Sequence, residues 1–138
     1  MGLFPLYTAL AASLSLLTPQ TVLGAQDDPM DRLLDAIAMV ESHNQPTATG
    51  DGGRAVGMYQ IHRAYWMEGT RILGVDWAYY DARDPEKARQ VVRAYLCHYG
   101  QGRSLLDLAR IHNGGPRGWE KAATLTYAYK IKQILNGP

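Results

Sequence analysis

Apolar residues recur at helical spacing through most of the sequence after residue 28. Such periodicity is typical of amphipathic helices whose apolar faces pack against one another. The spacing predicts helices over residues 29–42, 60–69, 85–99, 105–113 and 124–135. A chain of 138 residues has room for one compact domain. We therefore predict a single, mostly helical domain.

Local signals support several of the predicted helix ends. Asp28-Pro29 and Asp84-Pro85 each offer a capping carboxylate followed by a proline, which needs no N–H at the first helical position. Ser104 with Asp107 resembles a capping box. The apolar faces that we expect to be buried include Leu33, Leu34, Ile37, Ile61, Ala64, Tyr65, Val91, Val92, Tyr95, Leu96, Leu108, Ile111, Leu125, Ile131 and Leu135.

One glycine-rich segment, residues 46–58, interrupts the helical pattern. Its Asp51-Gly52 pair is typical of a tight turn. Pro46 ends the first helix, because a proline disfavours helix in the residue before it. We expect a short, irregular β-hairpin here, which makes the fold class α+β.

Charge and cysteine content exclude several classes of protein. The 14 Lys and Arg residues nearly balance 13 Asp and Glu, and a net charge of +1 is too small for a nucleic-acid-binding surface. We find no mature membrane span, no metal-binding spacing and no sign of a cofactor, and we expect a monomer. The single cysteine, Cys97, excludes internal disulfides; it lies on an apolar helical face and is predicted to be a buried thiol.

Residues 1–25 have the layout of a secretory signal peptide. The segment has no charged side chain, and an apolar run is followed by small residues and then by polar ones. Pro5, Pro19 and Gly24 interrupt it, which argues against a buried helix or a membrane anchor. We therefore expect a mature domain of residues 26–138, secreted or periplasmic. Export without disulfides favours a bacterial envelope or exterior over an animal secretory domain.

Two carboxylates stand in contrasting settings. Glu41 ends the first predicted helix beside the apolar Met39 and Val40, whereas Asp51 lies in the polar glycine-rich turn. Burial raises the pKa of a carboxyl group, so we expect Glu41 to be the proton donor and Asp51 the anion. Glycoside hydrolysis needs one carboxyl group of each kind. On spacing alone, a solvated glutamate and a turn-forming aspartate are the favoured explanation of the two residues.

The surrounding sequence resembles the invertebrate-type (i-type, destabilase-like) lysozymes. The first block of similarity comprises Val40-Glu41-Ser42, Gly50-Asp51-Gly52, Gly57-Met58-Tyr59-Gln60-Ile61 and Ala64-Tyr65-Trp66. A second block is the run from Ala109 to Gly118, with His112-Asn113-Gly114-Gly115-Pro116 at its centre. The first block is also similar to lytic transglycosylases, so the second block decides for the i-type family.

The resemblance implies a lysozyme-like fold and cleavage of the peptidoglycan glycan strand. Glu41 matches the family's general acid and Asp51 its second carboxylate. The resemblance also implies substrate contacts from Tyr59, Gln60, His112 and Asn113. From the residues alone, Gln60 could instead cap its helix, and His112 could merely stabilise the end of its own.

The sequence departs from the family pattern in two respects. Residues other than cysteine fill the family's cysteine positions, namely Ala38, His43, Val56 and Trp119. We expect aromatic packing to replace the cross-links, through Tyr95, Tyr99, Trp119 and Tyr129. The serines and lysine linked to isopeptidase activity in some members are also missing, since Gly53-Arg54-Ala55 and His62 stand there. We predict that this activity is absent.

Three functions remain open at the level of sequence. The first is a muramidase that hydrolyses the β-1,4 bond between N-acetylmuramic acid and N-acetylglucosamine, with Glu41 as acid and Asp51 as nucleophile or stabilising anion. The second is a lytic transglycosylase that uses Glu41 alone and leaves anhydro-muramic ends. The third is a peptidoglycan-binding module without catalysis.

Overall fold

The first helix has the bounds that its capping residues predict. The structure is a computed structural model and describes residues 28–137, so the predicted signal peptide lies outside the described residues. Helix α1 (Pro29–Ser42) begins where the Asp28 side chain accepts a hydrogen bond from the Met30 amide at 3.0 Å. It ends at His43, which adopts a left-handed conformation with φ of 54°. Glu41 is thereby placed in the last turn of the helix.

The predicted hairpin is confirmed. Strands β1 (Thr49–Gly50) and β2 (Ala55–Val56) pair antiparallel, with Thr49 opposite Val56 and Gly50 opposite Ala55. A 3-10 turn at Asp51–Gly53 joins them. A further antiparallel bridge between Val56 and Ile61 brings the chain back toward the helices.

Helix α2 (Arg63–Leu73) begins later than the spacing predicts. Ile61 is engaged in its bridge to Val56, and Gln60 has a left-handed φ of 49°, so neither residue is helical. Trp66 is fully buried on the inner face of α2, whereas Ala64, expected in the core, is exposed.

Helices α3 (Pro85–Tyr99) and α4 (Leu105–Gly114) confirm their predicted starts. Asp84 accepts hydrogen bonds from the first-turn amides of α3, and Ser104 accepts one from the Asp107 amide at 3.2 Å. The expectation for Cys97 was wrong, because this residue is exposed. Tyr95 and Leu96 occupy the buried face of α3. Cys97 is the next residue, and the helical rotation of about 100° per residue directs its side chain outward.

Helix α5 (Leu125–Asn136) closes the fold. Ala128 and Ile131 are buried on its inner face. Leu125, expected inside, is 55% exposed, and Tyr129, expected inside as the alternative to Ala128, is 64% exposed, because both lie on another face of the helix. Tyr129 therefore does not contribute to the packing that we expected to replace the disulfides.

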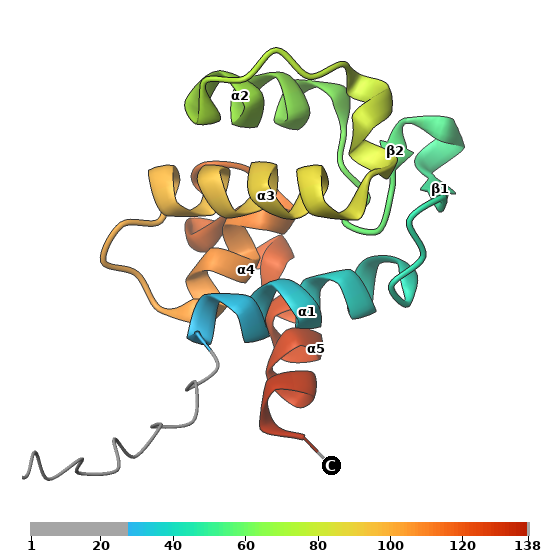
Figure 1. Cartoon of the computed structure of the whole chain (residues 1–138). Coiled ribbons are helices and arrows are strands. Elements are labelled where there is room, and N and C mark those ends of the chain that lie inside the picture. The colour runs from blue at the N-terminus through green and yellow to red at the C-terminus, as the bar shows by residue number, and fades with distance from the viewer. Residues whose placement is uncertain (1–27, 138) are drawn as a thin grey trace, which may run out of the picture.

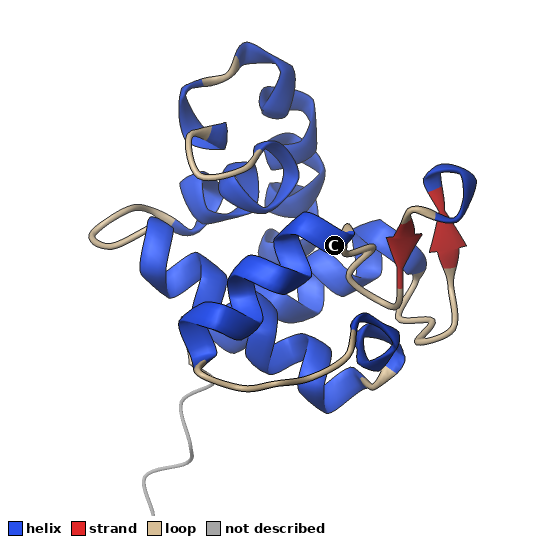
Figure 2. Cartoon of the chain, turned by 90° about the horizontal axis from the view of Figure 1, so that it is seen from above, coloured by secondary structure: helices blue, strands red, loops and turns tan. Residues whose placement is uncertain are grey.

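The helices enclose one core beside the hairpin. Helix α3 contacts α2 on one side and α1 and α4 on the other, and α5 packs on α1 and α4 (Figure 1). The two short strands lie at the edge of this helical body (Figure 2). The predicted α+β, mostly helical class is confirmed. The largest fully buried side chains are Trp66, Tyr59, Leu33, Leu34, Ile37, Ile61, Leu96, Ile111 and Ile131.

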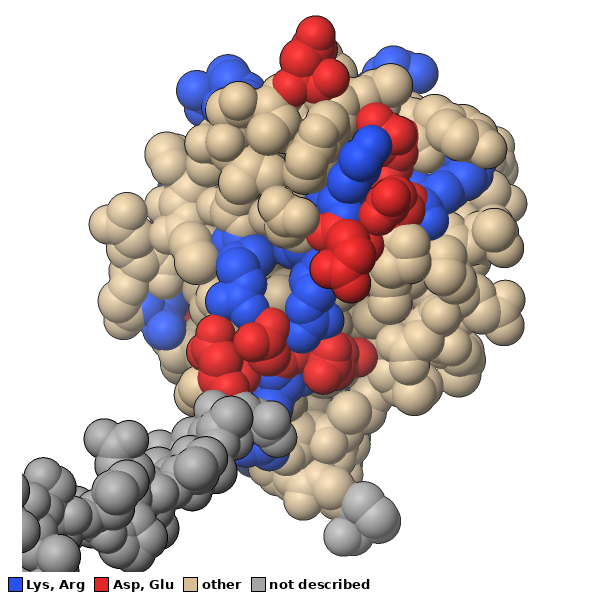
Figure 3. All heavy atoms as spheres, viewed as in Figure 1, with Lys and Arg blue, Asp and Glu red and all other residues tan. Residues whose placement is uncertain are grey.

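Ion pairs join α1 to α3 across their exposed edges. Arg89 binds Asp31 and Asp35 at 2.8 and 2.7 Å, and Arg93 binds Asp28 at 2.9 Å and also Asp31. Basic and acidic side chains are accordingly interspersed on the face seen in Figure 3. Among residues 28–137, no helix is both long enough and apolar enough to cross a membrane.

Candidate active site

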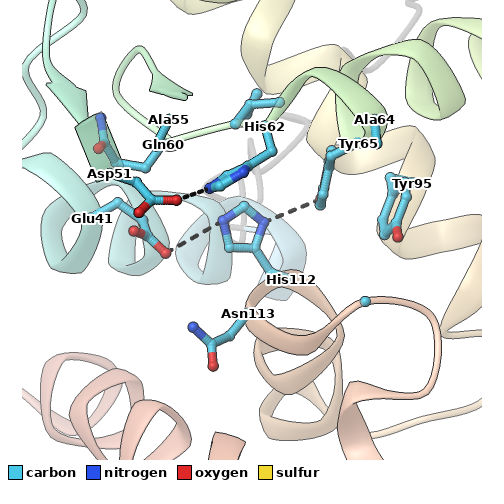
Figure 4. A pocket seen from close by; sticks show the side chains of 12 residues that line it. Glu41, Asp51, Ala55, Gln60, His62, Ala64, Tyr65, Tyr95, His112 and Asn113 are labelled. Atoms are coloured by element: carbon cyan, nitrogen blue, oxygen red, sulfur yellow. Dashed lines mark hydrogen bonds and ion pairs between the residues drawn. The ribbon is translucent and has the colours of Figure 1, made fainter. Parts of the chain in front are cut away.

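A cavity of about 570 Å³ opens where the end of α1, the hairpin, the start of α2 and the end of α4 meet. Figure 4 shows the side chains of Glu41 and Asp51 directed into the same space. The cavity therefore brings together the two carboxylates that the sequence singled out. Its lining consists of Glu41, Asp51, Ala55, Gln60, Ile61, His62, Ala64, Tyr65, Tyr95, His112, Asn113 and Gly115.

The carboxyl group of Glu41 is held by a tyrosine and a histidine. The Tyr127 hydroxyl donates a hydrogen bond to Glu41 Oε1 at 2.8 Å, and His112 Nε2 lies 3.6 Å from the same oxygen. Only 20% of the Glu41 side chain is exposed. Within the described chain both of these contacts fall on Oε1, and no hydrogen bond from protein reaches Oε2. One oxygen is fixed, and the other is left to exchange a proton.

These contacts overturn the expected direction of the Glu41 pKa. Burial raises it, but the hydrogen bond and charge of His112 and the hydrogen bond from Tyr127 outweigh burial, so the pKa lies below its usual value. Met39 and Val40 do not set the surroundings of the carboxyl group. Successive helical residues point about 100° apart, and Met39 is in fact 38% exposed.

Asp51 occupies a more open and strongly polar setting. Arg54 binds its Oδ1 at 3.0 Å, and His62 Nε2 lies 3.3 Å from its Oδ2. The side chain is 48% exposed. Asp51 has a left-handed φ of 51°, a conformation that aspartate adopts more readily than most non-glycine residues and that directs its side chain from the turn. The contrast in setting between the two carboxylates is therefore present.

His112 is buried beneath the cavity and bonded through both ring nitrogens. Nε2 lies 3.2 Å from the Tyr59 carbonyl oxygen, and Nδ1 lies 3.1 Å from the Tyr65 hydroxyl. A carbonyl can only accept, so Nε2 carries a proton, and Nδ1 accepts from Tyr65 when the ring is neutral. His112 thus does more than end its helix. The next residue, Asn113, is exposed on the cavity lining.

The two residues predicted for the cleft floor differ in placement. Gln60 lines the cavity, and its amide donates to the Gly57 carbonyl at 2.9 Å instead of capping α2. The Tyr59 side chain is 0% exposed, and its hydroxyl lies 3.2 Å from Arg89. It therefore cannot touch a bound sugar, which corrects the prediction. Tyr59 supports the site through its carbonyl group, which binds His112.

Sequence reasoning missed His62, Tyr65 and Tyr127 as members of the site. Tyr127 is separated from Glu41 by 86 residues, and nothing local in either segment indicates their contact. In the sequence, His62 stands out only as the replacement for a lysine. Its position directly after the Gly-x-x-Gln-Ile segment, two residues beyond the cavity residue Gln60, is nevertheless a usable signal.

The arrangement suits acid–base chemistry by carboxyl groups. It offers a nearly buried carboxyl group with one free oxygen and an ionisable partner across the same cavity. In the part of the chain that the structure describes, no group of three or more His, Cys, Asp or Glu side chains is placed to hold a metal ion.

Comparisons with known sequences give the family. The family model described as Destabilase matches residues 30–134. The chain is 34% identical over 115 residues to invertebrate-type lysozyme 6 of Caenorhabditis elegans, a match that covers 73% of this chain and 83% of that protein. It is 40% identical to a lysozyme of Ostrea edulis over 80 residues, which is 55% of this chain but only 57% of the oyster protein. The match to lysozyme 1 of Crassostrea virginica, at 37% identity, spans 42% of that protein.

Comparisons with solved structures agree with this result. A chain in the crystal structure of Aeromonas hydrophila PliI in complex with Meretrix lusoria lysozyme superposes with a TM-score of 0.64 at 30% identity, covering 73% of this chain and 86% of that one. The Tapes japonica lysozyme gives a TM-score of 0.62 at 27% identity, covering 75% of this chain and 88% of that one. Together with the matched family model, these similarities show that the chain belongs to the Destabilase family, the invertebrate-type lysozymes that its motifs resemble.

Proposed function

We propose that this protein is a lysozyme that hydrolyses the β-1,4 bond between N-acetylmuramic acid and N-acetylglucosamine in peptidoglycan. The observation that carries the proposal is the shared cavity of Glu41 and Asp51, one nearly buried and one open, in a chain of this family. Glycosidases divide the work between two such groups, and lysozymes are the standard example of this division. The position of Glu41 and Asp51 on one cavity supports this assignment.

In this mechanism Glu41 protonates the glycosidic oxygen. Tyr127 and His112 occupy Oε1, so the transferred proton is carried by Oε2. Asp51 faces the anomeric carbon and either stabilises its positive charge or attacks it. Because the pKa of Glu41 is lowered in the free enzyme, catalysis is favoured at acidic pH. A glycan that covers the cavity excludes water from Glu41 and strengthens the effect of burial, which raises the pKa toward a useful value.

Two further lining residues are assigned to the substrate. Gln60 and Asn113 offer amides to sugar hydroxyl or acetamido groups, and His112 holds the acid from below. The proposal includes a secreted or periplasmic monomer that acts on the wall polymer without a cofactor.

Product analysis tests the reaction type. Purified protein is incubated with isolated sacculi, and the released fragments are identified by mass spectrometry. We expect reducing muramic acid ends. Glu41→Gln should lower turnover by about 10²–10⁴-fold and leave the melting temperature nearly unchanged, since an amide cannot supply the proton.

Asp51→Asn separates the alternatives further. This substitution should severely impair a hydrolase, whereas a transglycosylase, which uses the glutamate alone, would tolerate it. If the products carry mostly anhydro-muramic ends, the protein is a lytic transglycosylase and the proposal of a hydrolase is wrong. If the wild type binds sacculi but releases no soluble products, the protein is a peptidoglycan-binding module without catalysis.

A further inference from the structure

A second cavity of about 400 Å³ adjoins the first. The two share His62 and Ala64, which stand between them at the start of α2. The second cavity extends from there to the turn of the hairpin and to Tyr79. Its lining consists of Gly53, Arg54, His62, Arg63, Ala64 and Tyr79. A polymer that is bound in the first cavity therefore passes close to the second.

The second cavity is basic. Two arginines and a histidine line it, and none of its lining residues is acidic. Asp51 engages Arg54 and His62 from the neighbouring cavity. Among residues 28–137, however, no acidic side chain forms an ion pair with Arg63. The cavity thus has a cation to offer to a ligand.

Arg63 is positioned to present that cation. Its guanidinium lies over the ring of Tyr79, 4.7 Å from the ring centre. The Tyr79 hydroxyl in turn lies 2.8 Å from the carbonyl oxygens of both Arg54 and Ile61, so the ring is anchored to the hairpin and to the start of α2. A guanidinium that stacks on an aromatic ring can still donate hydrogen bonds from the N–H groups along its edge. Two of these N–H groups can bind the two oxygens of one carboxylate.

The start of α2 adds to the attraction for an anion. His62 occupies the N-cap position but makes no hydrogen bond through its side chain to the first turn. The amides of that turn, which includes Arg63 and Ala64, therefore lack a side-chain cap. The positive end of the helix dipole lies at the same place.

We propose that this basic cavity binds a carboxylate of the peptide branches that peptidoglycan carries beside the scissile glycosidic bond. The inference rests on the proposed function, because it takes the glycan strand as the ligand of the first cavity. N-acetylmuramic acid carries a peptide branch with free carboxylates, so each strand presents anionic groups beside its sugar backbone. The protein then distinguishes peptide-bearing strands from bare glycan.

The test compares two substrates with one variant. Glycan strands with intact peptides and the same strands stripped by an amidase are digested by the wild type and by Arg63→Ala. We expect KM on peptide-bearing strands to rise about three- to tenfold in the variant, the range of a partly exposed charge-assisted contact, with little change in kcat. Kinetics on stripped strands should not change.

Arg103→Ala is the matched control. Arg103 also stacks on an aromatic ring, with its guanidinium 3.4 Å from the centre of the Trp119 ring, but it lines neither cavity. This variant removes the same charge and should leave the preference for peptides intact. Arg63→Lys keeps the charge but loses the planar guanidinium group. Its KM on peptide-bearing strands should therefore lie between those of the wild type and Arg63→Ala.

Binding measurements separate this inference from the proposed function. Calorimetry with soluble peptide-bearing and peptide-free fragments should show tighter binding of the former by the wild type and no such preference in Arg63→Ala. If Arg63→Ala weakens the binding of both fragments equally, or of neither, the basic cavity does not bind the peptide. A wild type that cleaves neither strand but retains the binding preference would instead refute the proposed hydrolysis.

Discussion

At the scale of single residues, Tyr127 adds to the effect of His112 on the ionisation of the acid. Its hydroxyl stabilises the ionised form of Glu41, and the pKa of Glu41 is low in part for that reason. Tyr127→Phe should therefore raise this pKa and move the alkaline limb of the pH profile of kcat/KM to higher pH. We expect kcat at the optimum to fall by less than about tenfold, because His112 still contacts the carboxyl group.

Tyr129→Phe provides the control for this measurement. Tyr129 lies on the same helix but is 64% exposed, so removal of its hydroxyl should leave the pH profile unchanged. A Tyr127→Phe enzyme with an unmoved alkaline limb would show that the limb does not report Glu41. A limb moved to lower pH would show that the hydroxyl stabilises the protonated acid.

The same scale shows what the sequence could predict about the site. Glu41 and Asp51 are ten positions apart, and the hairpin that carries Asp51 was foreseeable, so their meeting in one cavity was predictable. The direction of the Glu41 pKa was not, because it depends on His112 and Tyr127, which come from distant helices. Sequence neighbours of a helical residue are poor guides to its surroundings.

At the scale of elements, the contact of α2 with α3 depends on Gly69. A Cβ atom at this position would lie 2.5 Å from Val91 Cγ1 and 3.2 Å from the Val91 carbonyl oxygen. Alanine favours helix over glycine by about 1 kcal/mol, but overpacking a core contact costs about 1–3 kcal/mol. Gly69→Ala should therefore lower the free energy of unfolding by up to about 2 kcal/mol, as measured by urea denaturation.

A double-mutant cycle shows whether crowding is the cause. Val91→Ala removes the Cγ1 atom, so the loss in Gly69→Ala/Val91→Ala should be smaller than the sum of the single losses by about 1 kcal/mol. Additive losses would mean that the glycine serves some other purpose. A Gly69→Ala protein more stable than the wild type would mean that the helices separate at little cost.

Element boundaries differ in how far local signals determine them. The starts of α1, α3 and α4 follow from capping residues within a few positions of the helix, and all three were predicted. The start of α2 follows from the bridge between Val56 and Ile61, which belongs to the hairpin. From apolar spacing alone, α2 is predicted to begin at residue 60, because the spacing contains no information on the pairing of Ile61 with Val56.

At the scale of the whole molecule, stability rests on packing and on ion pairs. With one cysteine the chain can form no internal disulfide, and Ala38 and Val56, two positions where the sequence resemblance implies cysteines in the family, are buried in the core. Tyr95 stacks on Tyr65 with ring centres 3.8 Å apart, and Tyr99 packs on Tyr95 at 4.8 Å. The ion pairs between α1 and α3 then add a pH-dependent contribution to stability.

This contribution should make the protein sensitive to acid. Arg93 and Arg89 lower the pKa of Asp28 and Asp31, chiefly through hydrogen bonds, and Arg71 and Tyr99 lower that of Glu68 to about 2. A lowered pKa means that the unfolded chain binds protons more readily, so the stabilisation is complete above the ordinary carboxyl pKa and is lost below it. The melting temperature should therefore fall as the pH decreases from about 4.5 to 2.

Two variants and a salt series identify the source of that slope. Arg93→Gln should flatten the dependence of the melting temperature on pH, whereas Arg103→Gln, which removes a charge that stacks on Trp119, should not. Because these carboxylates are exposed, added salt should also flatten the dependence by screening their attraction to arginine. A melting temperature that stays constant down to pH 2 would contradict this account, since it would mean that both states bind protons equally and that packing alone joins α1 to α3.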